Sequence, residues 1–159
     1  MVTRIALLVG TLGSAFLSNA SYCVHAGTKR SDSVVKVSAT TTHRDGAGKQ
    51  LLSIILLHDK GWHTYANPIG IDEFENNKTI VTILLEGKPI DATVEYPAGT
   101  LVESSQIGNY RIYDNKVEIK AAVQRAQGDT SPLEVRVRIL ACHEMGACLP
   151  VAIVKALAR

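Results

Sequence analysis

Residues 133–150 read LEVRVRILACHEMGACLP, and this stretch decides which fold the chain adopts. Apolar residues stand at every odd position from Leu133 to Ile139, and charged residues stand at the even positions between them. A period of two is typical of a β-strand that buries one face. A short turn with Gly146 leads to a second apolar run at 149–157. The two runs predict an antiparallel hairpin.

Similar segments recur along the whole chain, separated by turn signals rich in Gly, Pro, Asn and Asp. The expected strands are 34–42, 51–58, 61–65, 79–85, 92–96, 110–113, 117–123, 133–141 and 149–157. Residues 51–58 are apolar on both faces, which predicts a central strand covered on both sides. Residues 27–33 are polar and are expected to form a flexible lead-in. This pattern predicts an all-β fold, an antiparallel β-sandwich.

The N-terminus has the pattern of a secretory signal: Arg4, then an apolar stretch at 5–17, then small residues suited to cleavage after Ala20 or Ala26. We expect residues 1–26 to be a signal peptide and 27–159 to be one domain. The apolar stretch is too short to span a bilayer, which needs about 20 residues. We expect no integral membrane segment after cleavage, and a periplasmic or secreted protein in an oxidising compartment.

The charge balance excludes some partners. The chain has 17 Lys and Arg against 15 Asp and Glu, a formal net charge of +2. Such a balance offers no electrostatic basis for binding nucleic acid or an anionic membrane.

The two cysteines of the hairpin form the candidate site, because Cys23 lies in the expected signal peptide. Cys142 has the parity of the charged residues before it, so it is expected on the solvent side of its strand. On the returning strand Val151 and Ile153 are expected to face the core, which also places Cys148 outward. Directly opposed residues lie about 4.5–5.5 Å apart at Cα, close enough for a disulfide.

Such a pair has three possible roles: a redox centre, a structural disulfide or a metal site. Cys142, His143 and Cys148 could ligate a metal, with His63 as the first candidate for a fourth ligand. The spacing matches no common zinc pattern, so neither a metal nor another cofactor is expected.

Strand alternation predicts where the side chains near the pair point. Neighbouring strand residues point apart, so His143 is expected in water rather than beside the sulfur of Cys142. Tyr65 and His63 alternate away from Trp62 and are candidates for lining the site. The acidic-aromatic run 72–75 is expected to be a solvated loop.

Three motifs in the same order resemble a known family. They are Cys142-x5-Cys148 with the following Pro150, the aromatic segment GWHTY at 61–65, and GNYRIYD at 108–114. The chain resembles the N-terminal periplasmic domain of the bacterial thiol:disulfide interchange protein DsbD over residues 34–158.

The resemblance implies an immunoglobulin-like sandwich with an exposed, redox-active disulfide. Cys148 would form the mixed disulfide with a partner, and Cys142 would resolve it. A cap loop near 103–108 would shield the pair. The family commonly presents an aromatic residue there, whereas this chain has Gln106 and Ile107, so the shielding is expected to be looser or to come from Tyr110.

The resemblance also implies partners. A thioredoxin-like domain would reduce the pair, and the pair would reduce disulfide isomerases or cytochrome c maturation thioredoxins. The chain ends at Arg159, so we expect a separate membrane electron carrier and a monomeric thiol:disulfide oxidoreductase. The rival hypothesis is a secreted, non-enzymatic β-sandwich that binds another protein and uses the hairpin disulfide for stability.

Overall fold

The computed structural model describes residues 28–158, so the expected signal peptide and Cys23 lie outside the described residues. The strands are β1 (Val35–Thr41), β2 (Lys49–His58), β3 (Trp62–Tyr65), β4 (Ile80–Leu85), β5 (Lys88–Pro89), β6 (Ala92–Glu95), β7 (Thr100–Val102), β8 (Tyr110–Asp114), β9 (Lys116–Gln124), β10 (Leu133–Ile139), β11 (Ala141–His143) and β12 (Ala152–Ala158). Two short 3-10 helices are η1 (Ser31–Ser33) and η2 (Asp72–Asn77). Within 28–158, no helix has the length and apolar character to cross a membrane.

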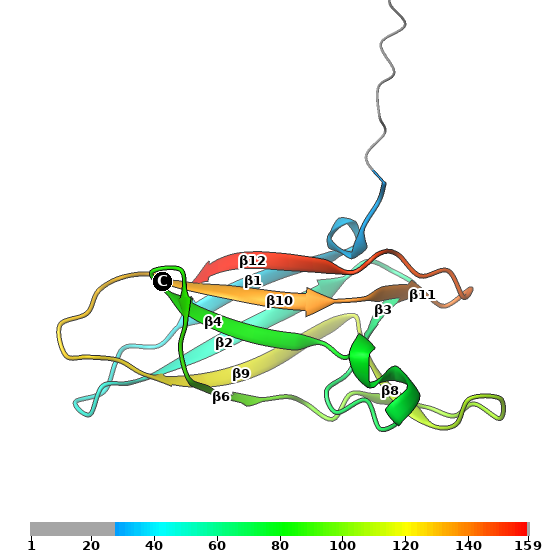
Figure 1. Cartoon of the computed structure of the whole chain (residues 1–159), viewed down its shortest axis with the longest axis horizontal. Helices are drawn as coiled ribbons and strands as arrows, with labels where there is room; N and C mark the ends of the chain where they lie inside the picture. The colour runs from blue at the N-terminus through cyan, green and yellow to red at the C-terminus, as the bar shows by residue number, and fades with distance from the viewer. Residues whose placement is uncertain (1–27, 159) are drawn as a thin grey trace, which may run out of the picture.

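The strands form two main antiparallel sheets and a third at one end (Figure 1). One main sheet has the order β1-β2-β9-β6 and the other β12-β10-β4-β5. The third sheet, β11-β3-β8-β7, lies at the end where β10 continues into β11. The fold is the immunoglobulin-like antiparallel β-sandwich that was predicted.

The core lies between the two main sheets and follows the predicted alternation. Leu133, Val135, Val137 and Ile139 are each 0% exposed. The facing sheet contributes alternate residues of β2 and β9, all of them buried: Leu52, Ile54, Leu56, Ile119, Ala121 and Val123.

The prediction that residues 51–58 are covered on both faces is wrong. β2 is a central strand, paired with β1 and β9, but only one of its faces enters the core. On the other face Leu51 is 47% exposed and Leu57 is 49% exposed. Isolated exposed leucines are ordinary on a soluble protein surface, so a central position in the sheet did not require cover on both faces.

The predicted inward orientation of the returning strand is also wrong. Ile153 is 56% exposed, and its neighbour Ala152 is buried instead. Ile139 pairs with Ala152, whereas Cys142 opposes Cys148, so the returning segment contains one residue more than its partner. An extra residue is a β-bulge, and it reverses the alternation of side chains beyond it.

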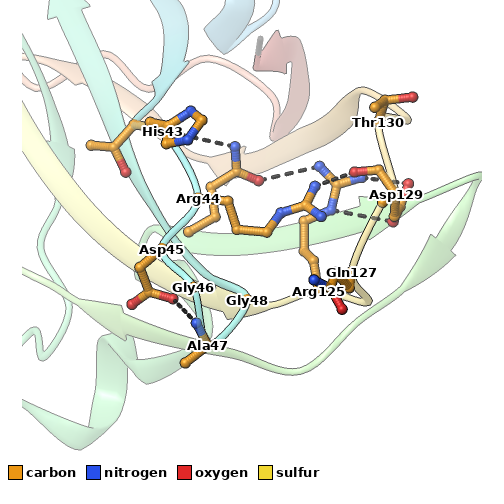
Figure 2. A pocket seen from close by; sticks show the side chains of 13 residues that line it. His43, Arg44, Asp45, Gly46, Ala47, Gly48, Arg125, Gln127, Asp129 and Thr130 are labelled. Carbon is orange, nitrogen blue, oxygen red and sulfur yellow. Dashed lines mark hydrogen bonds and ion pairs between the residues drawn. The ribbon is translucent and has the colours of Figure 1, made fainter.

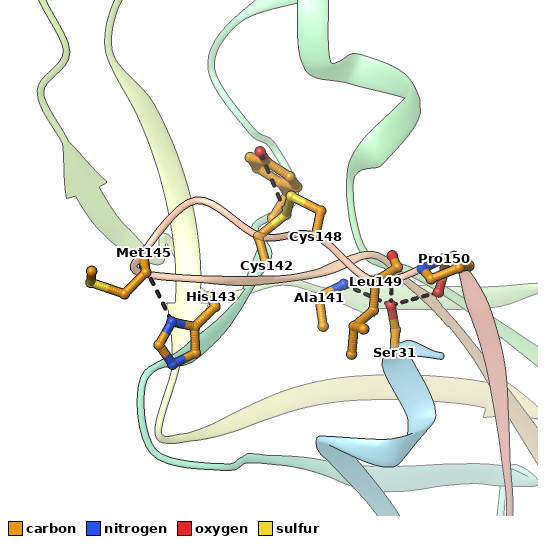
Figure 3. Close-up of a disulfide and its surroundings, with 9 residues drawn as sticks. Ser31, Ala141, Cys142, His143, Met145, Cys148, Leu149 and Pro150 are labelled. Atoms are coloured by element: carbon orange, nitrogen blue, oxygen red, sulfur yellow. Dashed lines mark hydrogen bonds between the residues drawn. A yellow bond between two sulfur atoms is a disulfide. The ribbon is translucent and has the colours of Figure 1, made fainter. Parts of the chain in front are cut away.

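The lead-in is not all flexible, because η1 is anchored at the bulge. Ser31 is fully buried, and its backbone N–H donates to the Pro150 carbonyl at 3.1 Å. Its hydroxyl donates to the same carbonyl at 2.9 Å and accepts from the Ala141 N–H at 2.8 Å (Figure 3). Ser31 therefore satisfies backbone groups that the bulge leaves out of the sheet ladder.

Candidate redox site at the Cys142–Cys148 hairpin

The predicted disulfide is present at the mouth of the hairpin. Cys142 and Cys148 are bonded with an S–S distance of 2.09 Å and oppose each other in an antiparallel bridge. Their Cα atoms lie 4.0 Å apart, closer than expected. The turn between them is held by the His143 N–H donating to the Ala147 carbonyl at 2.7 Å, and Gly146 takes a φ of 91°. A positive φ suits glycine, so the turn residue matches the turn.

The two sulfur-bearing residues differ sharply in exposure. Cys148 is exposed, as predicted, but Cys142 is only 3% exposed. The predicted solvent position of Cys142 is therefore wrong, although its strand parity is right. Cys142 projects from the same face of the third sheet as aromatic side chains of β3. These side chains cover Cys142 and keep water away from it. A partner can thus reach Cys148 far more easily than Cys142.

Strand pairing places four chemically active side chains in one line, which we call the cross-strand row: Cys148, Cys142, His63 and Asp114. Cys142 of β11 pairs directly with His63 of β3, and His63 pairs on its other side with Asp114 of β8. Directly paired residues of antiparallel strands project from the same face, with Cβ atoms about 4.5–5.5 Å apart. His63 therefore stands between the buried cysteine and a carboxylate.

Aromatic rings pack beside the cross-strand row. The Tyr65 hydroxyl lies 4.0 Å from Cys142 Sγ. Burial, and then Tyr110, raise the pKa of Tyr65, so this hydroxyl keeps its proton and faces the sulfur as a donor. The Tyr65 ring centroid lies 5.9 Å from that of Tyr110 and 5.5 Å from that of Phe74. Phe74 and Tyr110 also meet edge to face at 5.8 Å.

Phe74 is the site residue that the sequence analysis missed. The run 72–75 was expected to be a solvated loop, but it belongs to η2. Its acidic residues Asp72, Glu73 and Glu75 are exposed, whereas Phe74 is half-buried on Tyr65 and Tyr110. The available signal was a single aromatic residue between acidic ones, which is the pattern of a one-turn helix with one packed face.

We expect Phe74→Ala to uncover the buried cysteine. In a Cys148→Ser background, iodoacetamide should alkylate Cys142 about tenfold faster. The reason is that Tyr65 and Tyr110 each lose the ring of Phe74 as a neighbour, and each such contact contributes about 0.5–1.5 kcal/mol. Phe74→Leu, which keeps an apolar group, is the matched control and should change the rate less. An unchanged rate in Phe74→Ala would show that Phe74 does not protect Cys142.

The predicted cap residues lie on the β7–β8 loop and are exposed; Ile107 is 44% exposed. Backbone N–H groups of Gln106 and Ile107 lie 3.4 and 3.3 Å from the Ser104 hydroxyl, which shapes a local turn. Within 28–158, no hydrogen bond or ring contact connects either residue with the cysteines. Their role as a cap remains a prediction.

His143 projects away from the disulfide (Figure 3). Its ring meets Trp62 edge to face at 5.0 Å, and its Nδ1 accepts from the Met145 N–H at 3.2 Å. A side chain at Gly61 would stand 2.8 Å from His143 Nε2, so that glycine leaves room for the imidazole. His143 is half-buried against Trp62 rather than surrounded by water.

Beneath the site, the core-facing side of β3 carries a buried polar pair. His58 Nδ1 lies 3.1 Å from the Asn115 carbonyl, and Nε2 lies 3.0 Å from the Thr64 hydroxyl. The carbonyl can only accept, so Nδ1 carries the proton and Nε2 accepts from Thr64. Burial lowers the pKa of His58, and the neutral ring fits this pattern. The pair ties β3 to β2 and fixes the strand that presents His63.

Among residues 28–158, no three His, Cys, Asp or Glu side chains converge in the manner of metal ligands. With both cysteines bonded to each other, the arrangement is suited to two-electron exchange at sulfur.

A hollow of about 560 Å³ lies at the opposite end of the sandwich, between the β1–β2 turn and the β9–β10 loop (Figure 2). Arg44 and Arg125 line it, and both donate to protein groups: Arg44 to the Ala126 and Asp129 carbonyls, with its Nε left without a partner among the described residues. Arg125 contacts Gln50 at 3.2 Å and Asp129 at 2.8 Å, and donates to the Ser131 carbonyl at 2.7 Å. The Arg125 contacts join the loop after β9 to the start of β2, so we assign the hollow to stability rather than to chemistry.

Comparison with known proteins agrees with this geometry. The family described as "Thiol:disulfide interchange protein DsbD, N-terminal" matches residues 31–155. A search of curated proteins returned no match. The N-terminal periplasmic domain of ScsB from Proteus mirabilis has a TM-score of 0.55 and 17% identity, over 77% of this chain and 45% of that one.

The reduced N-terminal domain of DsbD from Neisseria meningitidis has a TM-score of 0.49 and 15% identity, over 79% of this chain and 85% of that one. A complex of the DsbD and PilB N-terminal domains from Neisseria meningitidis matches with a TM-score of 0.47 and 11% identity, over 75% of this chain and 80% of that one. With the family match over most of its length and a cysteine pair at the hairpin, the chain belongs to the family of DsbD N-terminal domains.

Proposed function

We propose that this protein is an exported thiol:disulfide exchange protein that passes electrons through Cys142 and Cys148 between thioredoxin-like partners. The observation that carries the proposal is the asymmetry of the pair: Cys148 is exposed and Cys142 is 3% exposed. An exchange protein needs one sulfur that a partner can reach and a second sulfur that resolves the mixed disulfide.

The geometry supports the following sequence. In the reduced protein the Cys148 thiolate attacks a partner disulfide and forms a mixed disulfide. The Cys142 thiolate then attacks Cys148 Sγ, the Cys142–Cys148 bond forms, and the partner leaves with both electrons as a dithiol. The opposed Cα atoms, 4.0 Å apart, mean that the second step needs no large backbone movement.

We propose thioredoxin-like proteins as partners and a separate membrane electron carrier as the source of electrons. Membership of the family of thiol:disulfide interchange protein DsbD N-terminal domains supports this class of partner. We also propose that the protein acts as a monomer in the periplasm or outside the cell, and that its activity is of the protein-disulfide reductase type.

A redox titration tests the function. We expect the Cys142–Cys148 couple to have a reduction potential between about −180 and −270 mV, the range of exchange proteins of the thioredoxin class. The measurement is the fraction of dithiol, by mass after alkylation, in buffers of defined glutathione or dithiothreitol ratio. A potential below about −300 mV would instead identify a structural disulfide and favour the binding module.

A further inference from the structure

We propose that His63 is the general base of the resolving step: it accepts the proton of the Cys142 thiol, and Asp114 stabilises the imidazolium that forms. The inference rests on the proposed function and adds a residue to it.

The placement of His63 is the first argument. Its pairing with Cys142 on one side and Asp114 on the other aligns thiol, imidazole and carboxylate on one face of the sheet. Direct cross-strand neighbours have Cβ atoms about 4.5–5.5 Å apart, within reach of contact between an imidazole and a thiol. The buried pair of His58 and Thr64 holds β3 from below, so the base sits on a rigid strand rather than on a loop.

Cys142 needs a base in order to react. It is 3% exposed, and burial of a thiol disfavours the thiolate, which is the form that attacks a disulfide. The neighbouring Tyr65 cannot take the proton, because its pKa is raised and its hydroxyl is already protonated. The exposed Cys148 has no such burial.

The third argument is the charge state of His63. Burial is the main effect and lowers its pKa, so the ring is neutral and able to accept a proton near neutral pH. Asp114 and Glu144 oppose that effect and favour the protonated ring, whereas His143 disfavours it. Asp114 is the paired residue and thus the group placed to stabilise the cation once it forms.

The Cys142 S–H transfers its proton to His63, giving a thiolate beside an imidazolium. The thiolate attacks Cys148 Sγ, so that the Cys142–Cys148 bond forms and the bond from Cys148 to the partner sulfur breaks. The electron pair leaves on the partner sulfur, which takes up the proton from His63. The partner disulfide has then gained two electrons and two protons over both steps.

Dithiobis(nitrobenzoate) separates the two steps in the reduced protein, with Cys23 replaced by serine so that only Cys142 and Cys148 react. Attack by Cys148 releases the first thionitrobenzoate, and attack by Cys142 on the mixed disulfide releases the second in a phase that does not depend on reagent concentration. In His63→Gln we expect the midpoint of the pH profile of the second phase to rise by about one pH unit. That shift corresponds to a tenfold smaller fraction of Cys142 thiolate at neutral pH. The more basic thiolate is a better nucleophile, so the net rate should fall about threefold.

Two variants control the experiment. His143→Gln removes the imidazole that follows Cys142 in sequence but lies on the opposite face. Because His143 disfavours the protonated His63 ring, its loss should not raise the midpoint of the second phase as His63→Gln does. Asp114→Asn should shift the midpoint in the same direction as His63→Gln, but less. A second phase in His63→Gln with the wild-type pH profile would overturn the inference, as would an equal shift of both phases.

The outcome distinguishes this inference from the proposed function. Normal exchange with a thioredoxin-like protein together with an unshifted second phase in His63→Gln refutes the role of His63 alone. A wild-type protein that never releases the second thionitrobenzoate, or whose couple lies below about −300 mV, refutes the exchange function itself.

Discussion

Cys142→Ser is expected to convert the protein into a trap for its partner. Cys148 remains exposed and can attack a partner disulfide, but the mixed disulfide has no second thiol to resolve it. Incubation of the reduced variant with an oxidised thioredoxin-like protein should give a covalent complex on a non-reducing gel that reductant dissolves. Steady-state reduction of the partner should fall more than about 100-fold, because the attacking group of the second step is gone.

Cys148→Ser is the matched variant, and the structure predicts a different result. Both variants lose one sulfur, but the remaining Cys142 is 3% exposed and packed beside Tyr65. We expect loss of activity without accumulation of the complex. A complex that forms equally with Cys148→Ser would mean that the exposure of the two cysteines does not set the order of attack, and a complex with neither variant would contradict exchange through this pair.

The parts of the site that could be predicted depend on pairing within one hairpin. The alternation from Leu133 to Ile139 determined which face of β10 enters the core, and the short turn determined that Cys142 and Cys148 oppose each other. The prediction failed where one inserted residue changes the parity. Ile153 was predicted to face the core because the alternation of side chains was counted without the bulge beside Pro150. Residues 149–157 are mostly apolar, so their pattern did not reveal the extra residue.

Contacts between distant segments explain the other failures. Cys142 is buried because Tyr65 arrives from β3, and Tyr65 is covered because Phe74 arrives from η2. No local pattern around 140–150 contains that information. Likewise, Ser31 looked like part of a polar lead-in, because its partners Ala141 and Pro150 lie more than a hundred residues along the chain.

Arg125→Ala is expected to be the most destabilising change outside the core and the disulfide. Arg125 is 7% exposed, and its guanidinium spans Gln50, Asp129 and the Ser131 carbonyl. The side chain thereby joins the loop after β9 to the start of β2. Its removal leaves the partly buried Ser131 carbonyl and Gln50 amide oxygen without their donor, and an unsatisfied group costs about 1–3 kcal/mol when it is fully buried.

We expect the free energy of unfolding to fall by about 2–3 kcal/mol, since water can reach part of the emptied hollow. The measurement is urea denaturation of the oxidised protein. Arg125→Lys should retain only part of the stability, because an ammonium group cannot reproduce the planar set of donors of a guanidinium.

Arg136→Ala is the matched control, since Arg136 also pairs with a carboxylate, Glu134, at 2.5 Å. That pair lies on the outer face of β10 with the Arg136 side chain 37% exposed, so its loss should cost less than about 1 kcal/mol. The potential of the Cys142–Cys148 couple should stay the same in both variants, because Arg125 belongs to the hollow between the β1–β2 turn and the β9–β10 loop, and these connections lie at the other end of the sandwich from β11 (Figure 1). Equal effects of the two substitutions would contradict a structural role for the hollow around Arg125 and reopen it as a binding site.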